Sequence, residues 1–156
     1  SGMNERHAAL VRAQGRFHAA IAGLDAAVLE REPAVGTWPV RDVVAHLIDW
    51  GNESLLAAEH ALGGPAVAHH PLADEGYNER SVARHAGDGW ASLREQLDAL
   101  FARAIALTAP LTAAQLAQPA DYPWGGTGTL DEVLGGIDAH QEEHTAQIER
   151  WVAAAR

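Results

Sequence analysis

The segment from residue 129 to residue 155 constrains the fold most strongly, because its apolar residues recur at every third or fourth position. This spacing predicts a long helix with one face turned toward a protein core. Thr129 and Glu132 have the spacing of a capping box, which predicts that the helix starts at Thr129. The inner face consists of Val133, Ile137, His140, His144, Ile148 and Trp151. Two ionisable rings therefore stand where apolar side chains are expected.

His140 and His144 are one helical turn apart, so their side chains lie one above the other, with Cβ atoms roughly 6 Å apart. Burying two imidazoles costs free energy unless each ring finds a partner. A metal ion that binds both rings is one such partner. Hydrogen bonds to carboxylates are the alternative, as in ordinary core or surface histidines.

The rest of the chain shows the same helical periodicity. We expect a first helix over residues 4–31, a second from the Trp38-Pro39 turn to residue 62, and a third from residue 78 to residue 107. Gly87-Asp88-Gly89 predicts a kink or a restart in the third helix, with Asp88 as the candidate N-cap. No strand-like alternation of useful length is present. The pattern therefore predicts an all-α four-helix bundle.

The connections carry further information. Residues 63–76 are long for a link between bundle helices and predict a crossover between the second and third helices. A short helix is expected to open after Thr112, and residues 118–128 are expected to form an ordered aromatic loop. Gly135-Gly136 inside the last helix costs about 1 kcal/mol per glycine relative to alanine. This pair therefore indicates close helix packing or room for a ligand.

Size and charge limit the function. The 156 residues fit one domain, expected over residues 3–156, with Ser1-Gly2 interpreted as an expression scar. A net charge of -10 argues against binding to nucleic acid or to an anionic membrane surface. No apolar run approaches the roughly 20 residues that span a membrane, and cysteine is absent. We therefore expect a cytoplasmic protein whose partners are small molecules or proteins; the sequence does not decide between a monomer and a homodimer.

A third histidine strengthens the metal hypothesis. His46 falls at an inward position of the second predicted helix. Together with His140 and His144 it offers three nitrogen ligands and an open position, as in catalytic metal sites. The absence of cysteine restricts the ligands to nitrogen and oxygen. Zinc or nickel is the expected ion, with iron or manganese as alternatives.

Three carboxylates lie near these histidines in sequence. Asp49 and Glu53 follow His46 on broadly the same side of its helix, and Glu143 follows His140 by three residues. One of them can orient an imidazole or act as a general base, and we assign Glu53 as the catalytic candidate. The alternative is that they are solvated surface residues.

Two stretches resemble motifs of a known superfamily. Trp38-Pro39-Val40-Arg41-Asp42-Val43-Val44-Ala45-His46-Leu47 and His140-Gln141-Glu142-Glu143-His144 are similar to motifs of the DinB-like, or YfiT-like, superfamily. Ile48-Asp49-Trp50-Gly51-Asn52-Glu53 and Tyr77-Asn78-Glu79 resemble its ClbS/DfsB-type branch. The resemblance covers nearly the whole chain. It implies a helical bundle with a long crossover and a divalent metal held by His46, His140 and His144.

The resemblance also implies an activity, because characterised members include metal-dependent transferases of low-molecular-weight thiols and a related isomerase. We therefore expect a metal-dependent enzyme that acts on a small electrophile as a thiol S-transferase or a hydrolase. The expected substrate-binding residues are Trp50, Tyr77, Asn78 and Trp124, with core packing as the alternative for Trp50, and Arg41, Arg80 or Arg84 as candidates for binding substrate carboxylates. A non-catalytic module that binds or sequesters a small molecule is the competing hypothesis, and a purely structural dimerising bundle is a third.

Overall fold

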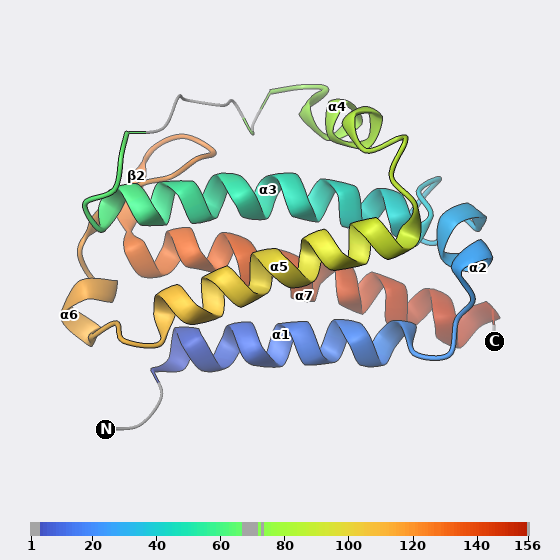
Figure 1. Cartoon of the computed structure of the whole chain (residues 1–156), viewed down its shortest axis with the longest axis horizontal. Helices are drawn as coiled ribbons and strands as arrows, with labels where there is room; N and C mark the ends of the chain where they lie inside the picture. The colour runs from blue at the N-terminus through green and yellow to red at the C-terminus, as the bar shows by residue number, and fades with distance from the viewer. Residues whose placement is uncertain (1–3, 67–71, 73, 156) are drawn as a thin grey trace.

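The computed structural model describes residues 4–66, 72 and 74–155, and most of them are helical. The long helices are α1 (Glu5–Ile21), α3 (Val40–Ala61), α5 (Trp90–Thr108) and α7 (Leu130–Ala155), and the short ones are α2 (Ala26–Arg31), α4 (Tyr77–Arg84) and α6 (Ala113–Leu116). The long helices run along the long axis of the molecule, and α1 and α3 each pack against both α5 and α7 (Figure 1). The prediction of an all-α domain is confirmed.

Apolar side chains on the facing sides of these helices form the core. Leu10 and Phe17 on α1 are fully buried, as are Leu93 and Phe101 on α5. Burying a side chain of this size stabilises the fold by about 1.5–3 kcal/mol. The inward stripe predicted for the last helix is confirmed, because Val133, Ile137 and Ile148 are buried.

The predicted length of the first helix is wrong. α1 ends at Ile21, and α2 begins only at Ala26. Gly23 between them has a φ of 80°, a left-handed conformation that interrupts the helix and that side chains with a Cβ rarely adopt. The apolar spacing continues through this break, and for that reason periodicity alone did not reveal it. Leu29 is buried on the short α2, which packs against α3 and α5.

The restart at residues 87–89 is confirmed, but the predicted cap is wrong. Gly89, not Asp88, occupies the N-cap of α5. The backbone N–H of Trp90 instead donates to Glu30 Oε1 from α2, at 2.9 Å. Asp88 Oδ2 lies 2.8 Å from His85 Nδ1. The Asp88 side chain therefore contacts the C-cap residue of α4 instead of capping α5.

The predicted aromatic loop is in part a β-hairpin. Strands β1 (Pro119–Asp121) and β2 (Thr127–Thr129) pair antiparallel, with Ala120 opposite Gly128. Three residues per strand are too few to show an alternating pattern in the sequence. The predicted short helix is present as α6, and Thr112 caps it. The capping box that starts α7 is confirmed, because Thr129 N–H donates to Glu132 Oε1 and Glu132 N–H donates to Thr129 Oγ1.

The predicted crossover falls on residues 63–76, and residues 67–71 and 73 of it lie outside the described residues.

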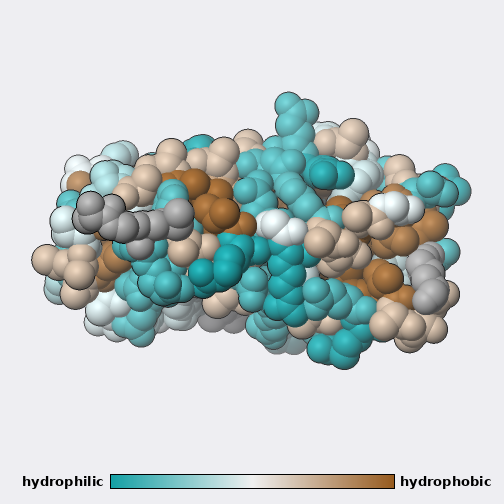
Figure 2. Space-filling view, turned by 90° about the horizontal axis from the view of Figure 1, so that it is seen from below, coloured by the Kyte–Doolittle hydropathy of each residue, from teal (hydrophilic) through white to brown (hydrophobic). Residues whose placement is uncertain are grey.

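On the face seen from below relative to Figure 1, polar and apolar residues are interspersed over the surface (Figure 2). Among the described residues, Val11 is the large hydrophobic side chain that is exposed, at 44%. No helix in the described part of the chain is both long and apolar enough to cross a membrane.

The glycine pair in α7 is predicted to mark close helix packing or room for a ligand, and close packing is confirmed at Gly136. A Cβ atom added there would lie 2.6 Å from Ser54 Oγ on α3 and 2.8 Å from Trp124 Cζ3. At Gly135 the nearest atoms belong to the flexible end of Arg6, at 3.2 Å. Gly136 therefore lets α3, α7 and the hairpin approach one another closely.

This contact leads to a stability prediction. We expect Gly136→Ala to lower the free energy of unfolding by about 1–3 kcal/mol, because the new methyl group overpacks the site. Gly15→Ala on α1 is the matched control, since its Cβ would meet nothing within 4 Å. That variant should gain about 0.5–1 kcal/mol from the more favourable helix propensity of alanine. Urea denaturation measures both, and a neutral Gly136→Ala would contradict the packing account.

Candidate metal centre

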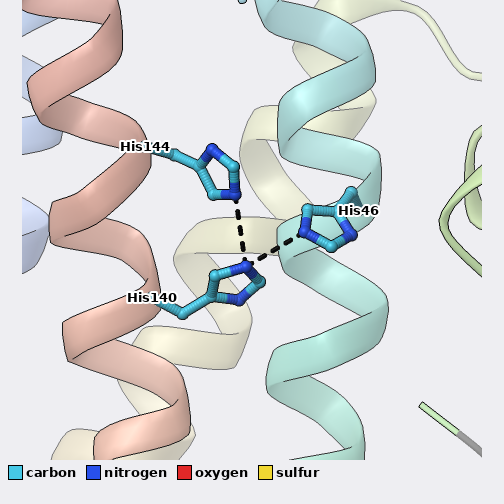
Figure 3. A group of neighbouring side chains, drawn as sticks. All are labelled: His46, His140 and His144. Atoms are coloured by element: carbon cyan, nitrogen blue, oxygen red, sulfur yellow. Dashed lines mark hydrogen bonds between the residues drawn. The ribbon is translucent and has the colours of Figure 1, made fainter. Parts of the chain in front are cut away.

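Helices α3 and α7 bring three histidines together in the interior of the bundle. His46 projects from α3, and His140 and His144 project from successive turns of α7 toward it (Figure 3). One ring nitrogen from each residue lies within 4.8 Å of the corresponding nitrogens of the other two. His46 is only 4% exposed, and the other two are half-buried. The predicted convergence of the three side chains is confirmed.

The nitrogens that face one another are all Nε2 atoms. His140 Nε2 lies 3.0 Å from His46 Nε2 and 3.2 Å from His144 Nε2. Two nitrogens that bind one zinc ion tetrahedrally, at about 2.0–2.1 Å each, lie about 3.3 Å apart. The measured separations therefore fit a shared divalent ion.

The Nδ1 atoms of the three rings have different surroundings. His144 Nδ1 lies 2.7 Å from Gln147 Oε1, so this nitrogen donates a proton and Nε2 presents its lone pair to the other rings. His46 Nδ1 and His140 Nδ1 are buried without a hydrogen-bond partner among the described residues. None of the three rings pairs with a carboxylate in that part of the chain, unlike His18 with Asp98. The alternative of carboxylate-bonded histidines is therefore wrong for this cluster.

Burial keeps two of the rings neutral. Burial, followed by the charge of His144, lowers the pKa of His46 to about 4, although Asn78 and Asp49 act in the opposite direction. Burial, together with smaller contributions from His46 and His144, lowers the pKa of His140 to about 3. At neutral pH both rings are unprotonated, which is the form that binds a metal ion.

An open pocket of about 850 Å³ lies beside His140. Trp50 and Trp124, two of the residues predicted to bind substrate, line it, and Tyr122, Arg6 and Glu143 line it as well. His140 is the member of the histidine cluster that lines the pocket. A molecule bound there would therefore lie next to the cluster.

The other predicted site residues are placed differently. Tyr77 and Glu53 line a separate pocket of about 340 Å³, together with Asp49 and Arg84. Asn78 lies between the two regions, because its Oδ1 accepts a hydrogen bond from Trp50 Nε1 at 3.1 Å. The structure thus brings Trp50 and Trp124 to the histidines and places Tyr77 and Glu53 in the neighbouring pocket.

The arginines predicted to recognise a substrate are engaged elsewhere. Arg41 donates to Asp42 and to the backbone carbonyls of His85 and Asp88, and Arg84 donates to Asp49. Arg80 lies 3.9 Å from Asp74. None of these three lines the pocket beside His140.

The arginine at this pocket is Arg6, which the sequence reasoning missed. Its Nε donates to Asp131 Oδ1 at 2.9 Å, and its Nη1 donates to Asp138 Oδ1 at 2.6 Å. Asp138 is buried on α7, next to the core residue Ile137. A carboxylate at a buried helical position needs a cationic partner, and this was the available signal for an arginine nearby.

The lowered pKa values predict how stability depends on pH in the metal-free protein. The unfolded chain, in which the histidine pKa is 6.5, binds more protons than the folded chain as the pH falls from about 6.5 to about 3, the folded pKa of His140. The free energy of unfolding should therefore fall as the pH is lowered through this window. His140→Leu should make that fall shallower, as measured by urea denaturation at a series of pH values. An unchanged pH dependence in His140→Leu would contradict the assignment.

Comparisons with known proteins agree with this geometry. The model of one family, described as the DinB superfamily, matches residues 9–148. No curated protein matches, and no solved structure matches. The family match spans all of the long helices at least in part and includes all three clustered histidines. The chain belongs to the DinB superfamily.

Proposed function

We propose that this protein is a divalent-metal-dependent enzyme that acts on a small electrophilic molecule, as a thiol S-transferase or a hydrolase. The observation that carries the proposal is the convergence of three Nε2 atoms beside an open pocket. Membership of the superfamily and the histidine cluster support metal binding. Zinc or nickel is the proposed ion, with iron or manganese as alternatives. The ClbS/DfsB-type branch and the cytoplasmic location stay predictions.

Each residue of the site has a proposed part. His46, His140 and His144, whose Nε2 atoms face one another, would hold the ion, and Gln147 fixes the tautomer of His144 through its contact with Nδ1. Such an ion supplies a Lewis acid that favours the deprotonated form of a thiol or of water at neutral pH. The indole rings of Trp50 and Trp124 exclude water from one side of the pocket. They hold the electrophile on that side, beside the histidine cluster.

The proton released from the nucleophile needs an acceptor. Glu143 lines the same pocket as His140, whereas Glu53, the residue assigned from the sequence, lines the neighbouring one. We therefore propose Glu143 as the acceptor. In a thiol transfer, the sulfur forms a bond to the electrophilic carbon, the thiol proton passes to the carboxylate, and the leaving group departs with its bonding electron pair.

A non-catalytic binding module is the second candidate. The pocket beside His140 is large enough for a drug-sized molecule, and aromatic side chains form much of its wall. Such a module would bind its ligand tightly, without turnover and without dependence on added metal. The convergence of the Nε2 atoms favours the enzyme, because ligand sequestration does not require three neutral imidazoles directed at one point.

Metal binding separates the two candidates. We expect the purified protein to bind about one zinc or nickel ion per chain after chelation and reloading, since three histidine ligands define one site. His140→Ala should lose this binding and all metal-dependent turnover while it retains the helical circular dichroism signal. His60→Ala is the matched control, because His60 lies exposed at the end of α3. A His140→Ala variant with full metal affinity would rule out the site.

A pair of glutamate variants tests the proton acceptor. We expect Glu143→Gln to lower kcat by about 100-fold, the usual contribution of a general base, and to leave the metal content unchanged. Glu53→Gln should change kcat by less, because Glu53 does not line the pocket beside His140. Steady-state kinetics of the metal-loaded variants provides the comparison. The opposite ranking would restore the assignment made from the sequence.

A further inference from the structure

Arg6 lines the pocket beside His140 but has no role in the proposed reaction. It belongs to the first turn of α1 and reaches α7, against which α1 packs (Figure 1). On α7, Asp131, Gly135 and Asp138 are spaced by four and three residues, so they share one face of the helix. The guanidinium of Arg6 therefore lies over Gly135, with a carboxylate about one helical turn away on either side.

One end of this guanidinium is left without a partner. Nε donates to Asp131 Oδ1 at 2.9 Å, and Nη1 donates to the two oxygens of Asp138 at 2.6 and 2.8 Å. Nη2 donates to none of the described residues. A Cβ atom built on Gly135 would lie 3.2 Å from Nη1 and 3.3 Å from Nη2, and Gly135 itself lines the pocket. The glycine thus leaves Nη2, with its two N–H groups, uncovered at the pocket wall.

The guanidinium is held in place before any ligand arrives. Its contacts with Asp131 and Asp138 are charge-assisted hydrogen bonds to two points of one helix, and its side chain is only 18% exposed. The guanidinium is also protonated at any ordinary pH. A donor that is already oriented binds a ligand without a further cost in side-chain entropy. Nη2 is therefore a preorganised hydrogen-bond donor for a molecule in the pocket.

The charge around Arg6 selects the kind of acceptor. The carboxylates of Asp131 and Asp138 more than balance the single positive charge of the guanidinium. A carboxylate or phosphate group bound at Nη2 would lose its hydration without a net positive charge to offset that cost. An uncharged carbonyl oxygen loses much less hydration and still accepts a hydrogen bond from the guanidinium. The arrangement therefore favours a neutral acceptor oxygen over an anion.

We propose that Arg6 is a substrate-binding residue whose Nη2 donates to an uncharged carbonyl oxygen of the electrophile in the pocket beside His140. The electrophile then carries a ketone, ester or amide group, and molecules that present a carboxylate or phosphate at this place are disfavoured. This inference rests on the proposed function, since it names the substrate class for the same site.

Three probes of nearly equal shape test the inference. Acetophenone carries the carbonyl oxygen, α-methylstyrene has a methylene group in its place, and benzoate has a carboxylate instead of the ketone. NMR titration of the metal-free protein gives the Kd of each probe. The ketone preference is the Kd of α-methylstyrene divided by the Kd of acetophenone, and its change between variants cancels the difference in hydrophobicity between the two probes.

Two variants remove the donor in different ways. Arg6→Lys keeps a cation opposite Asp138 but lacks a second terminal nitrogen, and it should lower the ketone preference about tenfold. Gly135→Ala should lower it as well, because the new methyl group displaces the guanidinium and leaves its charge unchanged. Arg12→Lys is the matched control on α1, since Arg12 pairs with Glu5 away from the pocket and should leave the preference as in the wild type.

Three results would overturn the inference. The first is a wild-type protein that does not bind acetophenone, and the second is one that binds benzoate more tightly than acetophenone in the absence of metal. The third is an unchanged ketone preference in Arg6→Lys that retains the helical circular dichroism signal. If Arg6→Lys does not fold, Gly135→Ala decides in its place, and an unchanged preference in that variant has the same meaning.

The zinc content of the same preparations after reloading keeps this inference separate from the proposed function. Protein that binds zinc but shows no ketone preference dependent on Arg6 contradicts the substrate class and leaves the metal site standing. Protein that shows this preference but binds no divalent ion supports the part of Arg6 and contradicts the metal-dependent enzyme.

Discussion

The contact between α3 and α7 is the interaction on which the site depends, because it buries three imidazoles against one another. His46 and His140 are held neutral by burial, and their Nε2 atoms lie 3.0 Å apart. Apolar side chains at these positions would pack with less cost in desolvation. An ion shared by the three rings would offset that cost, and so the histidine cluster links the packing of α3 and α7 to the proposed chemistry.

The elements around this contact are arranged so that the cluster is accessible from one side. Gly136 removes a side chain where α7, α3 and Trp124 meet, and the hairpin can then bring its aromatic residues to the pocket. The capping box at Thr129 fixes the start of α7 directly after β2. The hairpin and α7 are thus held in a fixed relative position, and Trp124 lies at a defined place beside the pocket that His140 lines.

Much of the site could be predicted from the sequence because the relevant signals are local. The helical spacing of His140 and His144, the inward position of His46 and the Thr129 capping box each depend on a few neighbouring residues. What was missed depends on distant contacts. Arg6 reaches the pocket only because α1 packs on α7, and Glu53 lines the neighbouring pocket with Tyr77 and Arg84 because α4 packs on α3.

The errors in the fold have a similar origin. The break at Gly23 leaves the apolar spacing unchanged, so only the backbone conformation reveals it. The hairpin has strands of three residues, too short for an alternating pattern, and is fixed by the turn at Gly125 and Gly126, both with positive φ. Asp88 had the composition of a cap, but Glu30 from a distant helix binds Trp90 N–H instead. In this last case a tertiary contact overrides the local signal.

X-ray absorption spectroscopy at the metal edge of zinc-loaded protein tests the central claim most directly, since it reports the ligands of the ion itself. The account predicts a first shell with three imidazole nitrogens at about 2.0–2.1 Å and a further light-atom ligand. A shell made only of carboxylate oxygens, or one with fewer than three imidazoles, would contradict it, because His46, His140 and His144 would then not hold the ion together.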